Sequence, residues 1–336
     1  MKKIKQIILE DIEEKNLTAG CKAKDDIRKI LKYPVFRCYK RYFHNNIMNY
    51  LFSIPRLLLH LSNLYNAESI VLQYPFYTHP FFNKFCYSLL PRKACVLIHD
   101  VNSLRYGRNE KEIRKEIQQL NHFRTLIAHT PHMSTWMRAN GVTSSIIELG
   151  IFDYVTSGKK NPQRIDYKLP YTVAFAGNLG KSIFLKQLIT LSSESLVFRL
   201  YGPNAPTYLS NNADYQGAFE SDELPDILQG HFGLVWDGSS LQECEDVSGN
   251  YLRYNSPHKF SLYMAAGMPV IIGSESALAA FVEQEKIGIA LSDLTDLPER
   301  LAQISFDEYS EMKANTEQIR KKVQSGYYIK HALKKN

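Results

Sequence analysis

The stretch best suited to bind an anion is YNSPHKFSLYMAAGMPVI, residues 254–271. Pro257, His258 and Lys259 stand at the start of an apolar helical pattern, which predicts a helix over 256–267 that begins on a cation. A lysine there opposes the helix dipole by about 0.3–1 kcal/mol, whereas a diphosphate would accept hydrogen bonds from the first amides and from Lys259. The alternative is an ordinary packed helix whose lysine reaches solvent.

A second phosphate candidate is FAGNLGKS, residues 175–182. A predicted strand leads into a glycine turn, and Lys181 stands where we expect the next helix to open. Gly177 and Gly180 would let the backbone approach a phosphate closely. The spacing is not that of a P-loop, so for these residues alone a plain strand-to-helix turn with a surface lysine is the simpler interpretation.

Acid–base chemistry could be carried by LIHDVNSLR, residues 97–105, where His99 and Asp100 follow an apolar strand. Transfer to a hydroxyl requires a proton acceptor nearby, and either side chain could act or orient the other. Alternatively, Asp100 only caps the following turn. His129 and His132 have no third ligand near them, and the sequence contains no D-x-D pair, so we expect no metal site.

The elements that must position these residues alternate between strands and helices. Strands are predicted at 3–9, 69–76, 93–100, 125–130, 144–154, 171–176, 196–203, within 213–219, and at 231–238, 268–274 and 287–293. A helical pattern with breaks at Pro34 and Pro55 fills residues 18–65. Ligands of such parallel sheets bind at the carboxyl ends of the strands.

This alternation predicts an α/β protein of two Rossmann-like domains with mainly parallel sheets facing a cleft. We place an N-terminal domain at 1–155, a linker at 156–170, and a C-terminal domain at 171–310, and the family resemblance described below implies that they serve the acceptor and the nucleotide sugar, respectively. Terminal helices follow at 311–336, with packing back on the N-terminal domain as one arrangement. The length of 336 residues suits two domains with a core each.

The composition indicates the cellular compartment and the surfaces that the protein could contact. Five scattered cysteines without a C-x-x-C pair indicate a reducing compartment, and no stretch reads as a signal peptide or a membrane span, so we expect a cytoplasmic protein. The net charge is +7, and residues 27–67 contain no Asp or Glu but many basic and aromatic residues. This stretch fits a peripheral contact with the anionic inner face of a membrane, a subunit interface of a homo-oligomer, or a solvated helix with core aromatics. No recognition motif favours nucleic acid.

The motif N-x-P-H-K-x-S-x-Y-x-A-x-G-x-P-V-I at 255–271 resembles the donor-site helix of GT-B-type glycosyltransferases. FGLVWDG (232–238), TAGCKAKDDI (18–27) and HDVNSLR (99–105) extend the likeness to a bacterial group. That group includes β-1,6-galactofuranosyltransferases and the glucosyltransferase that adds the second sugar to serine-rich adhesins. The resemblance covers most of the chain and implies a UDP-sugar donor, no metal, and a glycan acceptor on a lipid, polysaccharide or protein.

The resemblance also implies roles for individual residues. Lys181 and Lys259 would contact the diphosphate together with amides near Phe260 and Ser261, and Tyr215 would lie by the uracil or ribose. Thr18 and Gly20 would close over the phosphates. The full set assigned to the nucleotide sugar is Thr18, Gly20, Asn178, Lys181, Tyr215, Asp237, Asn255, His258, Lys259, Phe260 and Ser261. His99 and Asp100 are the candidates for proton transfer.

One departure limits what carries over. Many retaining enzymes of this fold have two glutamates eight residues apart across the motif, and Asn255 and Tyr263 stand at those positions here. Neither carries a carboxylate, so the sugar and the stereochemistry stay open. The sequence predicts a metal-independent hexosyltransferase using UDP-galactofuranose or UDP-glucose. The alternatives are a catalytically silent sugar-nucleotide-binding subunit and a sugar-nucleotide epimerase of similar two-domain shape.

Overall fold

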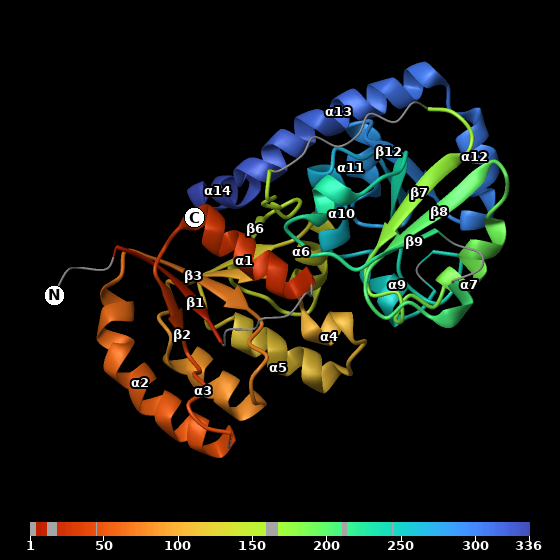
Figure 1. The fold of residues 1–336 in the computed structure, drawn as a ribbon. Coiled ribbons are helices and arrows are strands. Elements are labelled where there is room, and N and C mark those ends of the chain that lie inside the picture. The colour runs from red at the N-terminus through yellow and green to blue at the C-terminus, as the bar shows by residue number, and fades with distance from the viewer. Residues whose placement is uncertain (1–4, 12–18, 45, 159–166, 210–213, 244) are drawn as a thin grey trace. The chain divides into compact units, whose positions relative to one another are not determined.

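The computed structural model describes the chain except residues 1–4, 12–18, 45, 159–166, 210–213 and 244 (Figure 1). The chain forms two compact units. Unit 1 comprises Met1–Asn16, Lys24–Leu149 and Ile329–Asn336, and unit 2 comprises Leu17–Ala23 and Gly150–Tyr328. Helix α1 (Ala19–Leu31) therefore contributes its first turn to unit 2 and the rest to unit 1.

Unit 1 is built on a parallel sheet of six strands in the order β2-β1-β3-β4-β5-β6. The strands are β1 (Gln6–Glu10), β2 (Val35–Arg37), β3 (Ser69–Tyr74), β4 (Cys95–Ile98), β5 (Thr125–Ala128) and β6 (Ser145–Glu148). The connecting helices are α2 (Asn46–Asn66), α3 (Pro80–Leu89), α4 (Asn102–Arg105), α5 (Glu110–Leu120) and α6 (Pro131–Ala139). The strand order reverses direction between β1 and β3, where an α/β sheet opens a crevice at its carboxyl edge.

Unit 2 repeats this plan with the order β12-β11-β10-β7-β8-β9. Its strands are β7 (Tyr171–Ala176), β8 (Leu196–Tyr201), β9 (Asp214–Gly217), β10 (Phe232–Val235), β11 (Val270–Gly273) and β12 (Gly288–Leu291). Its helices are α7 (Leu185–Leu188), α8 (Leu224–Ile227), α9 (Val247–Tyr251), α10 (His258–Ala265), α11 (Ala279–Gln284), α12 (Leu297–Gln303) and α13 (Phe306–Ser325), and α14 (Tyr327–Lys334) follows. The direction reverses between β7 and β10.

The core of unit 2 covers both faces of its sheet, because alternate residues of β7 enter two apolar clusters. Val173 and Phe175 belong to one cluster, and Ala174 and Ala176 belong to the other, with α10. The small side chains on the α10 face let that helix lie close to the sheet. A Cβ placed on Gly233 would come within 2.3 Å of the Tyr263 ring, so glycine is required there.

The structure confirms a strand at each position predicted from the sequence and corrects three local details. The pattern over 18–65 is not helical throughout, because the short strand β2 pairs in parallel with β1 between α1 and α2. Helix α2 continues through Pro55, whose exposed position lets water serve the carbonyl that loses its partner. Helix α7 opens at Leu185, so Lys181 lies in a turn ahead of it.

None of the helices within the described residues is both long and apolar enough to span a membrane.

Candidate functional site

Lys259 lies at the switch point of the unit 2 sheet. Its ammonium group donates to the Trp236 carbonyl oxygen at 2.6 Å, just beyond the end of β10, and lies 4.9 Å from the centre of the Phe175 ring on β7. Asp237 approaches to 4.0 Å. Burial lowers the pKa of Lys259, while Asp237 acts in the opposite direction. An anion bound at this point would stabilise the charge that burial disfavours.

The start of α10 has no side-chain cap. Pro257 at the N-cap cannot accept a hydrogen bond from the first amides, whereas Ser305 and Thr130 cap α13 and α6. The Phe260 N–H donates to the Pro257 carbonyl at 2.9 Å, which corrects our expectation that this amide faces the diphosphate. The first donors of the helix are therefore the amides of His258 and Lys259.

Three buried polar atoms surround this helix start. Asn255 Oδ1, His258 Nε2 and Ser261 Oγ have no hydrogen-bond partner among the residues that the structure describes. Buried polar atoms are normally paired, and an unpaired one costs about 1–3 kcal/mol. An uncapped helix start surrounded by such atoms is the arrangement expected of a binding site for a polar, anionic ligand.

His258 is held between aromatic rings and the first turn of α1. The ring centres of His258 and Tyr154 lie 4.9 Å apart, and Lys22 Nζ lies 4.3 Å from the centre of the Tyr154 ring. Lys22 also donates to the Val155 carbonyl at 2.6 Å and pairs with Asp222 at 2.9 Å. Burial and the nearby Lys22 lower the pKa of His258 to about 3, so its ring is neutral near pH 7.

The other loops at the carboxyl edge of this sheet are tied to one another. A Cβ on Gly202, whose φ is +139°, would lie 1.8 Å from the Gly177 carbonyl oxygen, so the turns after β7 and β8 touch. The Tyr215 hydroxyl donates to the Gly202 carbonyl at 3.0 Å. Asn178 accepts from the Asn204 amide at 3.3 Å, and Lys181 is exposed nearby in the same turn. Tyr215, Asn178 and Lys181 therefore lie close to the same edge of the unit 2 sheet.

Tyr263 has a structural position beneath α10. It is fully buried, and its hydroxyl accepts from the Ala176 N–H at 2.8 Å. Asn255 lies at the helix start, where its side-chain oxygen is one of the unpaired atoms. Of the two positions at which related enzymes often carry acids, only Asn255 is therefore placed to meet a ligand in unit 2.

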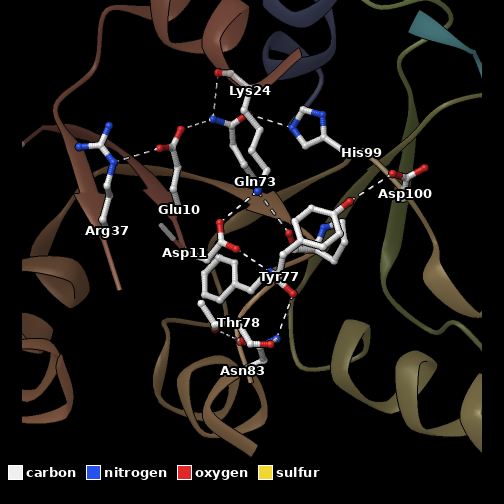
Figure 2. Close-up of polar contacts among 12 residues, drawn as sticks. Glu10, Asp11, Lys24, Arg37, Gln73, Tyr77, Thr78, Asn83, His99 and Asp100 are labelled. Carbon is white, nitrogen blue, oxygen red and sulfur yellow. Dashed lines mark hydrogen bonds and ion pairs between the residues drawn. The ribbon is translucent and has the colours of Figure 1, made fainter. Parts of the chain in front are cut away.

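In unit 1, the predicted pair His99 and Asp100 follows β4 at the carboxyl edge, and a buried hydrogen-bond chain leads to His99 (Figure 2). Glu10 is fully buried at the end of β1 and accepts from Gln73 Nε2 at 2.5 Å and from Arg28 at 2.9 Å. Gln73 Nε2 also donates to the Lys24 carbonyl at 3.2 Å. Gln73 Oε1 lies 2.9 Å from His99 Nε2.

This chain determines which ring nitrogen of His99 carries the proton. Two acceptors, Glu10 and the Lys24 carbonyl, fix the nitrogen of the Gln73 amide, so its oxygen faces His99. An amide oxygen can only accept, so His99 Nε2 is the donor and the neutral ring keeps its basic lone pair on Nδ1. In the neutral ring, Nδ1 is therefore the nitrogen that can accept a proton, and it is buried.

Asp100 belongs to a second set of contacts in the same unit (Figure 2). It pairs with Arg105 and accepts from the Tyr77 hydroxyl at 3.2 Å. Asp11 is buried, accepts from the Tyr77 N–H at 2.5 Å and pairs with Lys24 at 3.1 Å. With its charge compensated by Arg105, Asp100 is better suited to orient the loop after β3 than to take up a proton.

The remaining predicted residues have simpler outcomes. Thr18 lies outside the described residues, and Gly20 lies in the first turn of α1. Among the side chains that the structure describes, no group of three or more His, Cys, Asp or Glu is arranged to hold a metal ion. Sequence reasoning missed Glu10 and Gln73, although a polar residue inside the apolar strand SIVLQY was a signal that could have pointed to Gln73.

Two Rossmann-like units, each with a parallel six-stranded sheet, are the architecture of the GT-B class of glycosyltransferases. Among solved structures, HepE of Anabaena in complex with UDP-glucose superposes with a TM-score of 0.59 at 12% identity, covering 98% of this chain and 97% of that one. This likeness shows the fold.

The chain belongs to the glucosyltransferase 3-like family. The model of the family's N-terminal domain matches residues 4–151, and that of its C-terminal domain matches 173–336. The β-1,6-galactofuranosyltransferase WbbI of Escherichia coli K12 is 28% identical over 97% of this chain and 96% of its own length. Glucosyltransferase 3 of Streptococcus gordonii is 22% identical over 93% and 92%.

Proposed function

We propose that this protein transfers a hexose from a UDP-sugar to a hydroxyl of a glycan acceptor without a metal ion. The observation that carries the proposal is the uncapped start of α10, where Lys259 and three unpaired polar atoms surround the first amides. A pyrophosphate would accept hydrogen bonds from the first amides, from Lys259 and from Ser261 Oγ, whereas Asn255 Oδ1 is itself an acceptor and would need a donor such as a hydroxyl of the sugar. The UDP-glucose bound to HepE supports a uridine nucleotide as the donor.

The donor side of the reaction needs a stabilised leaving group. As the bond between the anomeric carbon and the phosphate oxygen breaks, negative charge grows on UDP. Lys259 and the amides of His258 and Lys259 would stabilise that charge in a partly dry site, which is the role a metal plays elsewhere. Lys181 and Asn178 would contact the nucleotide from the turn after β7, and Tyr215 would flank its base or ribose.

On the acceptor side, we assign His99 as the general base and Gln73 as its positioning residue. The acceptor oxygen would form the new bond to the anomeric carbon while its proton moves to His99 Nδ1. The Glu10–Gln73 chain would keep His99 Nε2 protonated and so preserve Nδ1 as the acceptor. This role fits inversion of the anomeric centre; in a front-face retaining transfer, the departing phosphate oxygen would take the proton of the acceptor instead of His99.

Two donors remain in the proposal, because the named relatives differ in the sugar they transfer. WbbI is a galactofuranosyltransferase and glucosyltransferase 3 is a glucosyltransferase. WbbI has the higher identity to this chain, at 28% against 22%, which favours UDP-galactofuranose as the first donor to test. The proposal keeps all three carriers of the acceptor glycan: a lipid, a polysaccharide and a protein.

Titration calorimetry with UDP tests the nucleotide site. We expect binding in metal-free buffer, with unchanged affinity after EDTA treatment. Absence of binding, or binding that EDTA abolishes, would contradict the site assignment.

A panel of UDP-hexoses then tests the activity by measuring sugar transfer to simple acceptors and hydrolysis to UDP. UDP release with one donor supports the transferase. Tight UDP binding without turnover of any donor would instead indicate a silent nucleotide-binding subunit.

A further inference from the structure

Helix α2 exposes an apolar face along its length. The side chains of Leu51 and Leu59 are 57% and 79% exposed. The exposed apolar residues of this helix are Ile47, Met48, Leu51, Phe52, Leu58, Leu59 and Tyr65. Their spacing of three, four and seven residues places most of them along one side, while Leu57 and Leu64 face the core. A soluble protein rarely exposes a continuous apolar strip of this length without a partner.

The loop before α2 extends this face with an ordered aromatic cluster. Asn49 accepts from the Tyr42 and Phe43 amides at 2.8 Å each and donates to the Phe43 carbonyl at 2.9 Å. The ring centres of Phe43 and Phe52 lie 5.1 Å apart. The buried Asn49 therefore holds two exposed aromatic rings against the first turns of α2.

Helix α3 lies beside α2 and adds to the same surface (Figure 1). The Tyr50 ring lies 5.0 Å from that of Phe82, and the Tyr50 hydroxyl accepts from the His79 N–H at 3.1 Å. On α3, Phe81 is 82% exposed and Phe85 is also exposed. We call the exposed apolar residues of α2 and α3, with Tyr42 and Phe43, the α2–α3 face.

The charges around this face have one sign. Between residues 27 and 99 the sequence contains a single acid, Glu68. The structure corrects the simple count of basic residues, because four of them are used internally: Arg28 and Lys29 pair with Asp25, Arg37 pairs with Glu10, and Arg56 donates to the Arg37 carbonyl. The exposed cations that remain at the face are Lys40, Arg41 and Lys84.

We propose that the α2–α3 face binds the surface of an anionic lipid bilayer. The apolar side chains would enter the boundary between headgroups and acyl chains, and Lys40, Arg41 and Lys84 would meet the lipid phosphates. The single sign of charge favours lipid over a second copy of the chain, because two such faces would bring like charges together. The inference deepens the proposed function by naming where a lipid-linked acceptor is met, but binding can be measured without transfer.

Co-sedimentation of the full chain with vesicles tests this proposal. We expect binding to equimolar phosphatidylglycerol and phosphatidylcholine, and much weaker binding to phosphatidylcholine alone. Leu59→Glu, at an exposed position, should reduce binding roughly tenfold or more by removing an inserted apolar side chain. The double variant Lys40→Ser/Arg41→Ser should lose about fivefold per cation, and high salt should act similarly.

Phe306→Glu is the matched control, because Phe306 is 60% exposed at the start of α13 in unit 2. It should bind vesicles as the wild type does, and all variants should keep wild-type UDP affinity. Failure of the wild type to bind anionic vesicles, or wild-type binding by Leu59→Glu, would overturn the proposal. A wild-type dimer in light scattering that Leu59→Glu dissociates would assign the face to self-association instead. Loss of UDP binding would concern the proposed function alone.

Discussion

Replacing Lys259 with methionine separates its roles as an anion ligand and as a structural contact. Methionine keeps an apolar stem of similar length over the Phe175 ring but removes the ammonium group that donates to the Trp236 carbonyl at 2.6 Å. A charge-assisted contact with a phosphate oxygen is worth about 1.5–3 kcal/mol. We therefore expect the dissociation constant for UDP to rise roughly 10- to 150-fold.

The ligand-free protein should respond much less to this change. The lost bond to Trp236 costs about 1 kcal/mol, whereas removing a charge that burial disfavours acts in the other direction. The free energy of unfolding should therefore stay within about 1 kcal/mol of the wild-type value. Calorimetric titration with UDP and denaturant unfolding measure the two quantities on the same samples.

The matched control is Lys286→Met, which removes an exposed lysine of the same unit that pairs with Glu311 at 2.8 Å. Its UDP affinity should equal that of the wild type. Wild-type affinity in Lys259→Met would refute the reasoning and leave Lys259 as a structural contact to Trp236. If Lys259→Met lost stability as well as UDP affinity, the variant would be misfolded, and the change in its dissociation constant would no longer measure the contact between Lys259 and phosphate.

Five further substitutions test other parts of the structure. His99→Ala should lower kcat about 10²–10⁴-fold, and Gln73→Leu should lower it by less. Gln73→Leu should also change the pH profile of kcat, while both variants keep the wild-type affinity for UDP. A wild-type pH profile in Gln73→Leu would contradict the tautomer assignment. The pKa of His258 is lowered to about 3 in the folded protein and is about 6.5 unfolded, so the unfolded chain binds the extra proton between these values. The free energy of unfolding should fall by up to about 1.4 kcal/mol per pH unit as the pH drops through this window. Denaturant unfolding at several pH values should show that the stability of His258→Gln depends less steeply on pH than that of the wild type. Tyr263→Phe leaves the Ala176 N–H without its acceptor and should lower the free energy of unfolding by about 1–3 kcal/mol. Denaturant unfolding curves with the same midpoint and the same m-value as the wild type would disprove this loss. Gly202→Ala would place a Cβ 1.8 Å from the Gly177 carbonyl, so we expect lower thermal stability together with weaker UDP binding.

The donor-side candidates could be proposed from the sequence because they are local. Pro257, His258 and Lys259 are consecutive, and a helix start needs only its own amides to bind an anion. The turn after β7 and Tyr215 on β9 were also placed at the correct edge, since parallel strands bring their carboxyl ends together. The opening of α7 was misplaced, because Ser182 is a preferred N-cap residue just after Lys181, whereas the helix has Phe184 at its N-cap without a side-chain hydrogen bond.

The hydrogen-bond chain that leads to His99 could not be predicted from any local sequence pattern. Glu10, Gln73 and His99 come from three strands and meet only because β1, β3 and β4 are neighbours in the sheet. The α2–α3 face likewise depends on the fold, here on which charges are turned inward. Residues 27–67 looked uniformly basic, yet the fold turns Arg28, Arg37 and Arg56 toward internal partners and leaves an apolar face outside.

The sequence by itself determined the family, the two α/β units and the cation at the start of α10, because periodicity, turn chemistry and one specific motif are written in consecutive residues. The contact of His99 Nε2 with Gln73, and the polar atoms at α10 that have no partner among the described residues, could be known only from the folded chain. Hydrogen bonds between distant segments fix those properties, and their partners are set by strand order and packing rather than by spacing along the chain.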